Sequence, residues 1–191
     1  LSDGGYVLVS NSLGGAADLI DGLVDATNDS VNDNLSFGAS AFDALASGAN
    51  NIAIGNTASS SMTGGSRNVG IGQEALKSNT TGEDNIAIGS NSLRSNSSGY
   101  DNVGLGNGAL IQNSTGYWNV ALGRESLSSN TTGSANVALG RFAMISNTIG
   151  YDNVALGPES MGSNVSGNFN VAMGRMALRL NKTGGQNTMV G

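Results

Sequence analysis

The chain contains no cysteine and no histidine among its 191 residues. Without cysteine it has no disulfides, no Cys-ligated zinc and no thiol chemistry. Without histidine it lacks the commonest general base and metal ligand. We therefore expect a protein that is not an enzyme, with no catalytic residue, no metal site and no cofactor.

Long apolar runs and basic patches are missing as well. No stretch approaches the ~18 apolar residues of a membrane-spanning helix. Residues 1–66 hold seven Asp and no Lys or Arg (−7), and residues 67–191 hold eight Lys or Arg and seven Asp or Glu (+1), which sum to the net charge of −6. With no basic stripe to follow a phosphate backbone, we expect neither a membrane span nor nucleic-acid binding.

Glycine, by contrast, is abundant and regularly placed, with 30 Gly against one Pro. An Asn begins the pattern Asn-apolar-small-apolar-Gly in ten copies at a constant spacing of 17 residues, and the last copy departs from the pattern at Thr188 and Met189. These residues are Asn34, Asn51, Asn68, Asn85, Asn102, Asn119, Asn136, Asn153, Asn170 and Asn187. A fixed period excludes a flexible linker and indicates that each repeat is one stacked structural unit.

The start of each repeat has the pattern of a short β-strand. In the repeat 119–135, Val120 and Leu122 share one face of an extended segment, and Ala121 points to the other. A helix is disfavoured, because two Gly per repeat and many Asn, Ser and Thr each lower helix propensity. We expect the aliphatic positions to form ladders inside each coil, with the small-residue face outside.

The pattern therefore predicts an all-β fold, a parallel β-solenoid (β-roll or β-helix) with one 17-residue coil per repeat. The solenoid is expected over residues 34–191, and residues 1–33 are expected to form an N-terminal cap or connector with a short helix near 16–26. Stacked Asn amides can bond to the coils above and below. The predicted structural ladder consists of Asn51, Asn68, Asn85, Asn102, Asn119, Asn136, Asn153 and Asn170.

Each coil has little core of its own, which favours self-association. About three large apolar residues per coil contribute at most ~2–3 kcal/mol each, against an ordering cost on the order of 25 kcal/mol for the coil. A face of Ala and Gly would let another backbone approach closely, and we expect a homotrimer around the fibre axis. The alternative is that the small residues simply fit a tight coil interior.

The repeat NVALGRESLSSNTTGSA (119–135) resembles the 17-residue repeats of bacteriophage tail-fibre proteins. Its Asn-Val-Ala-Leu-Gly core also resembles the head repeats of bacterial trimeric autotransporter adhesins. The resemblance covers residues 34–191 and implies a left-handed coil, a homotrimer and a location in the virion tail fibre or at a cell surface. It implies a stiff shaft segment that presents or contributes to host receptor binding, with other fibre or baseplate proteins as partners. An adhesin head is the alternative.

The two positions before each repeat Asn vary and hold most of the aromatic residues. These are Tyr100, Tyr117, Trp118, Tyr151 and Phe169. In a solenoid they would line one edge over several coils, where rings can stack on the sugars of a host cell-surface glycan. The competing interpretation is packing at a subunit interface or at a corner of the coil.

Two further patterns allow other interpretations. Paired Ser and Thr columns, such as Thr80-Thr81 and Thr131-Thr132, are similar to the arrays of ice-binding solenoids, although Val, Ile and Lys interrupt them. Asn-x-Ser/Thr sequences such as Asn113 and Asn130 are formal glycosylation acceptors, but a ladder of Asn at the turns explains them with fewer assumptions. The acidic residues are spread over six repeats and predict no paired catalytic carboxylates.

Overall fold

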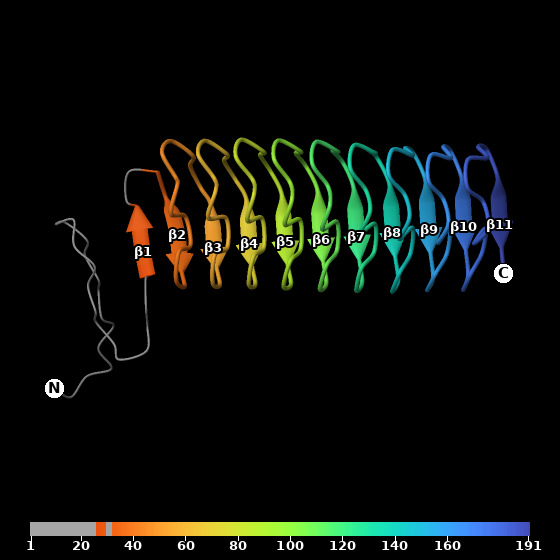
Figure 1. Cartoon of the computed structure of the whole chain (residues 1–191), viewed down its shortest axis with the longest axis horizontal. Coiled ribbons are helices and arrows are strands. Elements are labelled where there is room, and N and C mark those ends of the chain that lie inside the picture. Colours follow the sequence, from red (N-terminus) through yellow and green to blue (C-terminus); the bar gives the residue numbers. More distant parts are fainter. Residues whose placement is uncertain (1–25, 30–31) are drawn as a thin grey trace, which may run out of the picture.

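The computed structural model describes residues 26–29 and 32–191, and these form a regular stack of coils (Figure 1). The strands are β1 (Ala26–Asp29), β2 (Asn34–Phe37), β3 (Ile52–Ile54), β4 (Val69–Ile71), β5 (Ile86–Ile88), β6 (Val103–Leu105), β7 (Val120–Leu122), β8 (Val137–Leu139), β9 (Val154–Leu156), β10 (Val171–Met173) and β11 (Thr188–Val190). They form one 11-stranded sheet in sequence order. The described residues contain no helix. The predicted all-β solenoid with one 17-residue coil per repeat is confirmed.

Neighbouring coils pair in strict register around the whole circumference. Strands β2 to β11 are parallel, and Val103 pairs with Val120, one repeat later. Outside the strands, the Leu110 N–H donates to the Ser126 carbonyl at 3.0 Å, again between adjacent coils. Each coil therefore supplies the hydrogen-bond partners of the next, and an insertion in one coil would break the ladder on both sides.

The strands face the opposite way from the expectation. The small middle residue of each strand points inward, so that Ala121 is fully buried, while the flanking residues point outward, with Ile86 38% and Ile88 40% exposed. The coil is narrow, and its interior is already occupied by a large residue from the opposite wall, such as Leu127. Only a small side chain fits against it. The expectation of aliphatic strand ladders inside the coil was therefore wrong.

From the coil that begins at Asn68 onward, the large core residue is the ninth residue of the repeat, counting the Asn as the first. It is fully buried in the central coils, as Leu76, Leu93, Leu110, Leu127, Met144 and Met161. Its backbone is left-handed, with φ of 54° at Leu110 and 52° at Met144. A β-branched side chain is poorly tolerated at positive φ, which explains why this column, with Phe42 and Ser59 in the first two coils and Leu or Met in the others, contains no Val or Ile.

We expect Leu110→Ile to destabilise the protein by about 1–2 kcal/mol more than Leu110→Met, because only isoleucine is β-branched at positive φ. Both substitutions nearly conserve volume, so packing alone would cost less than about 1.5 kcal/mol. Urea denaturation at a fixed protein concentration measures the difference. The matched control is Leu105→Ile, which lies in extended strand β6 and should show no such penalty. Equal costs for the two Leu110 variants would contradict this account of the column.

The two ends of the solenoid differ. At the N-terminal end β1 runs antiparallel to β2 and pairs with its outer edge, Ala26 opposite Phe37. Of the helix expected near 16–26, all but Ala26 lies outside the described residues. At the other end all three residues of β11 are exposed, and Val190 is 75% exposed.

Candidate functional site

The repeat Asn column forms a continuous buried ladder of amides. Nδ2 of Asn119 donates to Oδ1 of Asn102 at 3.1 Å and to the Gly133 carbonyl at 2.8 Å. Its Oδ1 accepts from both the backbone N–H and the Nδ2 of Asn136, each at 3.1 Å. The same contacts recur at the predicted ladder residues, which are Asn51, Asn68, Asn85, Asn102, Asn119, Asn136, Asn153 and Asn170. This column positions one corner of every coil.

A second buried Asn ladder runs parallel to the first. Nδ2 of Asn113 donates to Oδ1 of Asn96 at 2.8 Å and to the Gly116 carbonyl at 3.0 Å. The column runs from Asn79 to Asn181, and in the two earlier coils its place is taken by apolar residues. With both amide hydrogens engaged and no exposed surface at Asn113, a glycan cannot attach there in the folded coil. Sequence reasoning placed this column at a turn and missed its burial.

The five aromatic residues singled out in the sequence lie along one edge of the coils, in two groups. The first group consists of Tyr100, Tyr117 and Trp118. The two tyrosine rings stack with parallel planes and centroids 4.9 Å apart, and Trp118 meets Tyr117 edge-on at 5.1 Å. Trp118 is 57% exposed, and its indole N–H donates to the Asp101 carboxylate at 3.2 Å. The ring is thus both solvent-accessible and fixed in orientation.

The second aromatic group lies farther along the same edge. Tyr151 and Phe169 meet edge-on with centroids 5.2 Å apart, and Phe169 is 50% exposed. Between the groups, one coil carries Ser134 and Ala135 at the corresponding positions. The structure therefore brings the predicted aromatic residues together as two clusters interrupted by one coil of small residues.

A long aliphatic surface lies on the outer face of the sheet. We define the outer aliphatic strip as the first and third residues of strands β3 to β10, together with Leu35 and Phe37 of β2. Every one of these side chains is at least partly exposed. Monomeric proteins seldom expose a contiguous apolar patch beyond a few hundred Å², so a strip along the whole rod points to an interaction surface.

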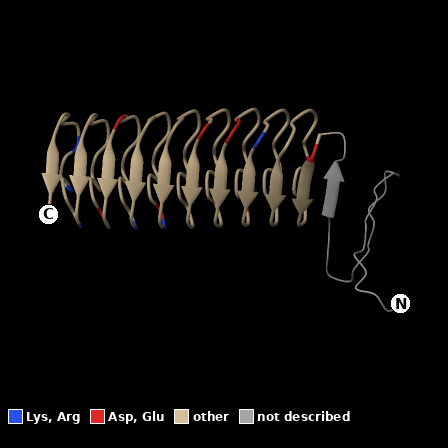
Figure 2. Ribbon diagram, turned by 180° about the vertical axis from the view of Figure 1, so that it is seen from behind, with Lys and Arg blue, Asp and Glu red and all other residues tan. Residues whose placement is uncertain are grey.

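Strands β2 to β11 contain no charged residue, and the charged residues of the coils lie on the turns at the coil edges, as Figure 2 shows. Arg67 donates to Asp84 at 2.7 Å and to Glu83 at 2.6 Å in the next coil. The hydrogen bond from Arg67 holds the pKa of Asp84 below its usual value. On another edge the Arg141 guanidinium lies over the Phe142 ring, 4.3 Å from its centroid. None of these charges lies on the outer aliphatic strip, which leaves that strip free of charge repulsion.

Of the two paired Thr and Ser columns considered for ice binding, the first makes hydrogen bonds within the coil stack. Thr131 Oγ1 donates to the Thr148 carbonyl at 3.0 Å, and Ser114 Oγ donates to the Thr131 carbonyl at 3.0 Å. These hydroxyl hydrogens are directed along the rod axis to the next coil. The hydroxyls of this first column therefore bond along the axis, while Thr132 of the second column is exposed.

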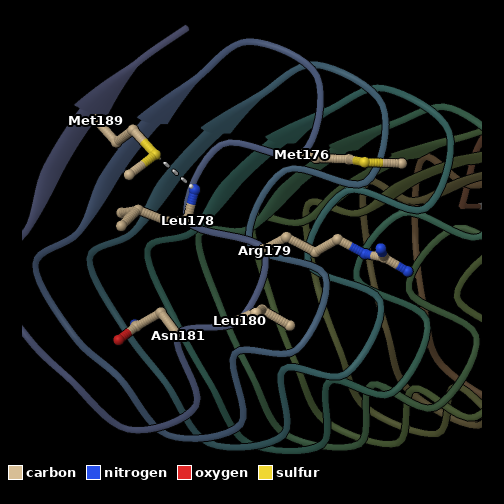
Figure 3. A pocket seen from close by; sticks show the side chains of 6 residues that line it. All are labelled: Met176, Leu178, Arg179, Leu180, Asn181 and Met189. Atoms are coloured by element: carbon tan, nitrogen blue, oxygen red, sulfur yellow. Dashed lines mark hydrogen bonds between the residues drawn. The ribbon is translucent and has the colours of Figure 1, made fainter.

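An apolar pocket lies at the C-terminal end of the solenoid, lined by Met176, Leu178, Leu180 and Met189 among others (Figure 3). In central coils the N–H of the core residue donates to a carbonyl of the next coil. At Leu178 the equivalent N–H donates to the Met189 sulfur at 3.2 Å. The pocket is thus formed by the core wall of the last turn.

The described residues contain no group of three or more His, Cys, Asp or Glu placed to hold a metal ion. No helix within 26–29 and 32–191 is long and apolar enough to cross a membrane. Comparison with protein-family models, curated proteins and solved structures gives no match. The function must therefore be argued from the aliphatic strip and the aromatic edge themselves.

Proposed function

We propose that the chain is a shaft segment of a homotrimeric surface fibre of the bacteriophage tail-fibre kind. In this proposal the repeated coils set the length of a stiff rod, which holds a receptor-binding end away from its particle. Exposed residues of the rod contribute to contact with the host surface. Other fibre or baseplate proteins join the rod at its ends, and the rod is located in the virion or at a cell surface.

The outer aliphatic strip is the observation that carries this proposal. Ile86 and Ile88 project from one strand with about two fifths of their surface exposed, and the equivalent pair recurs in each neighbouring coil. Burying such pairs contributes roughly 25 cal/mol per Å² of apolar surface. Association of rods along their full length would bury the strip and add a second apolar core outside the coils.

This finding changes the interface that the sequence suggested. The Ala and Gly face, expected to admit another backbone, is buried inside the coil, as at Ala121. Association therefore has to use the aliphatic side of the same strands. The number of chains, three, and a left-handed coil remain what the resemblance to tail-fibre and adhesin repeats implies. The adhesin head stays the alternative, and the flanking sequence, with an anchor or a chaperone domain, would distinguish the two.

The mass in solution tests the proposal. We expect three times 19.1 kDa, about 57 kDa, in light scattering coupled to gel filtration. The double variant Leu122→Lys, Val137→Lys should be monomeric, because two charges would have to be desolvated in the interface. The matched control is Thr132→Lys, which should stay trimeric. Thr132 is exposed in the same coil as Leu122 but does not belong to the sheet. A wild-type mass of one chain at micromolar concentration would overturn the proposal.

A further inference from the structure

The aromatic edge contains one column in which a ring is missing. Four successive coils place Tyr100, Tyr117, Ser134 and Tyr151 at the same repeat position. Tyr100 and Tyr117 stack in parallel with centroids 4.9 Å apart, which matches the spacing of neighbouring strands. The column therefore keeps its rings at the axial repeat of the coils, and the serine interrupts it once.

Tyr151 makes an edge contact of the same kind as a tyrosine in the first cluster. Its edge contact with Phe169, at an interplanar angle of 84°, repeats the 85° contact of Tyr100 with Trp118. Both contacts join a residue of the column to the residue 18 positions later. Tyr117 and Tyr151 are two coils apart, or about 10 Å at the spacing of parallel strands. A ring midway between them would lie at the same distance from each as Tyr100 does from Tyr117.

The serine does not fill that place. Ser134 is only 8% exposed, and its Oγ accepts from the Tyr117 N–H at 3.2 Å and donates to the Thr132 carbonyl at 3.3 Å. Its side chain is thus held against the backbone. The neighbouring Ala135 carries only a methyl group. A coil with small, inward-held residues here separates two coils that each present a tyrosine.

The chemistry around the missing ring is amphipathic. Tyrosine faces offer apolar surface to the C–H side of a sugar ring, as aromatic side chains do for other ring systems. Asp152, exposed beside Tyr151, supplies carboxylate acceptors for hydroxyl groups. Asp101, bonded to Trp118, adds a second negative charge on this edge. These carboxylates would repel acidic sugars, which selects for uncharged ones.

We propose that an uncharged pyranose ring of a surface glycan binds between Tyr117 and Tyr151, in the place where the column lacks a ring. Asp152 accepts hydrogen bonds from its hydroxyls, and the adjoining sugars continue along the rod over Trp118 or Phe169. This inference rests on the proposed role of the rod in surface attachment and gives that role a specific site. The proposal predicts one binding site per chain, midway between the two aromatic clusters.

The single tryptophan makes the site directly observable, because Trp118 is the only indole in the chain and contacts Tyr117. The experiment titrates the full chain with neutral disaccharides and trisaccharides of glucose, galactose, mannose and N-acetylglucosamine. Intrinsic fluorescence and calorimetry are followed together. We expect a saturable fluorescence change with at least one of these sugars, and no binding of an equivalent sialylated trisaccharide.

Two variants and a control locate the site. Ser134→Tyr should supply the missing ring and abolish binding, and Tyr151→Ala should weaken it by about 10-fold through loss of one stacking face. Phe142→Ala, on another edge, should bind as the wild type does. Circular dichroism checks that each variant is folded. If Ser134→Tyr does not fold, Tyr151→Ala still tests the site, because it leaves Ser134 and its backbone hydrogen bonds unchanged.

Three results would overturn this proposal. They are no response to any neutral saccharide, unchanged binding by Ser134→Tyr and Tyr151→Ala, or a Trp118 emission that is already blue-shifted because a second subunit covers the ring. The last result would assign the aromatic edge to a subunit interface. A trimer that binds no sugar refutes the saccharide site alone, whereas a monomer that binds sugar refutes the shaft alone.

Discussion

Replacing Asn119 with alanine should lower the free energy of unfolding by about 3–5 kcal/mol. The substitution removes two donors and a shared acceptor from a fully buried ladder. It leaves the backbone N–H of Asn136 and one hydrogen of its side-chain amide unpaired where water cannot reach them, while the Gly133 carbonyl keeps only the hydrogen bond from Asn130. Each buried group left without a partner costs ~1–3 kcal/mol, so the loss exceeds that of the hydrogen bonds alone.

Two matched variants separate the ladder from a general effect of losing asparagine. Asn107 is exposed in a neighbouring coil, and Asn107→Ala should change stability by no more than about 0.5 kcal/mol. Asn187 lies at the end of the ladder, where it donates to Asn170 at 2.9 Å and is only partly buried, so its loss should cost less. Urea denaturation at constant protein concentration provides the comparison, because association would shift the midpoint. Equal costs at Asn119 and Asn107 would refute the structural role of the ladder.

The period alone was sufficient to predict the sheet and the adjacency of residues 17 positions apart. A 17-residue period places Tyr100 beside Tyr117 and Asn102 beside Asn119. The faces of the strand could not be assigned in the same way, because Val-Ala-Leu alternates equally well in either orientation. The choice depends on the width of the coil, and that width is determined by Leu127 on the opposite wall.

The left-handed backbone at several non-glycine residues was also not predicted from the sequence. Left-handed residues recur at three positions of the coil, including Glu125, Leu127 and Ala135, with φ of 51–55°. A signal was present, because the columns of Leu127 and Ala135 contain no Val, Ile or Thr. The hydrogen bond from Trp118 to Asp101 had no comparable signal, since it depends on the rotamers of two exposed side chains.

The glycine that follows each strand offers the second large effect. Gly106→Ala should destabilise the protein by about 3–5 kcal/mol. Gly106 has a φ of 136°, where residues with a Cβ are strained, and a Cβ there would lie 2.7 Å from the Gly123 carbonyl oxygen of the next coil. That oxygen belongs to a stacked glycine in the same corner, so neither coil can move aside without disturbing its own neighbour.

Gly108 provides the control, because it also has positive φ but faces a flexible neighbour. Its φ is 67°, and an added Cβ would meet only the Cγ of Glu125 at 3.3 Å. The corresponding position of the preceding coil is Asn91, with φ of 60°, so Gly108→Asn should cost at most about 1 kcal/mol. Thermal and urea unfolding measure the loss of stability in both variants. A much larger loss for Gly106→Ala would show that close stacking of the corners, rather than positive φ alone, fixes the repeat at 17 residues. Similar losses at the two positions would assign the effect to backbone strain and contradict the stacking argument.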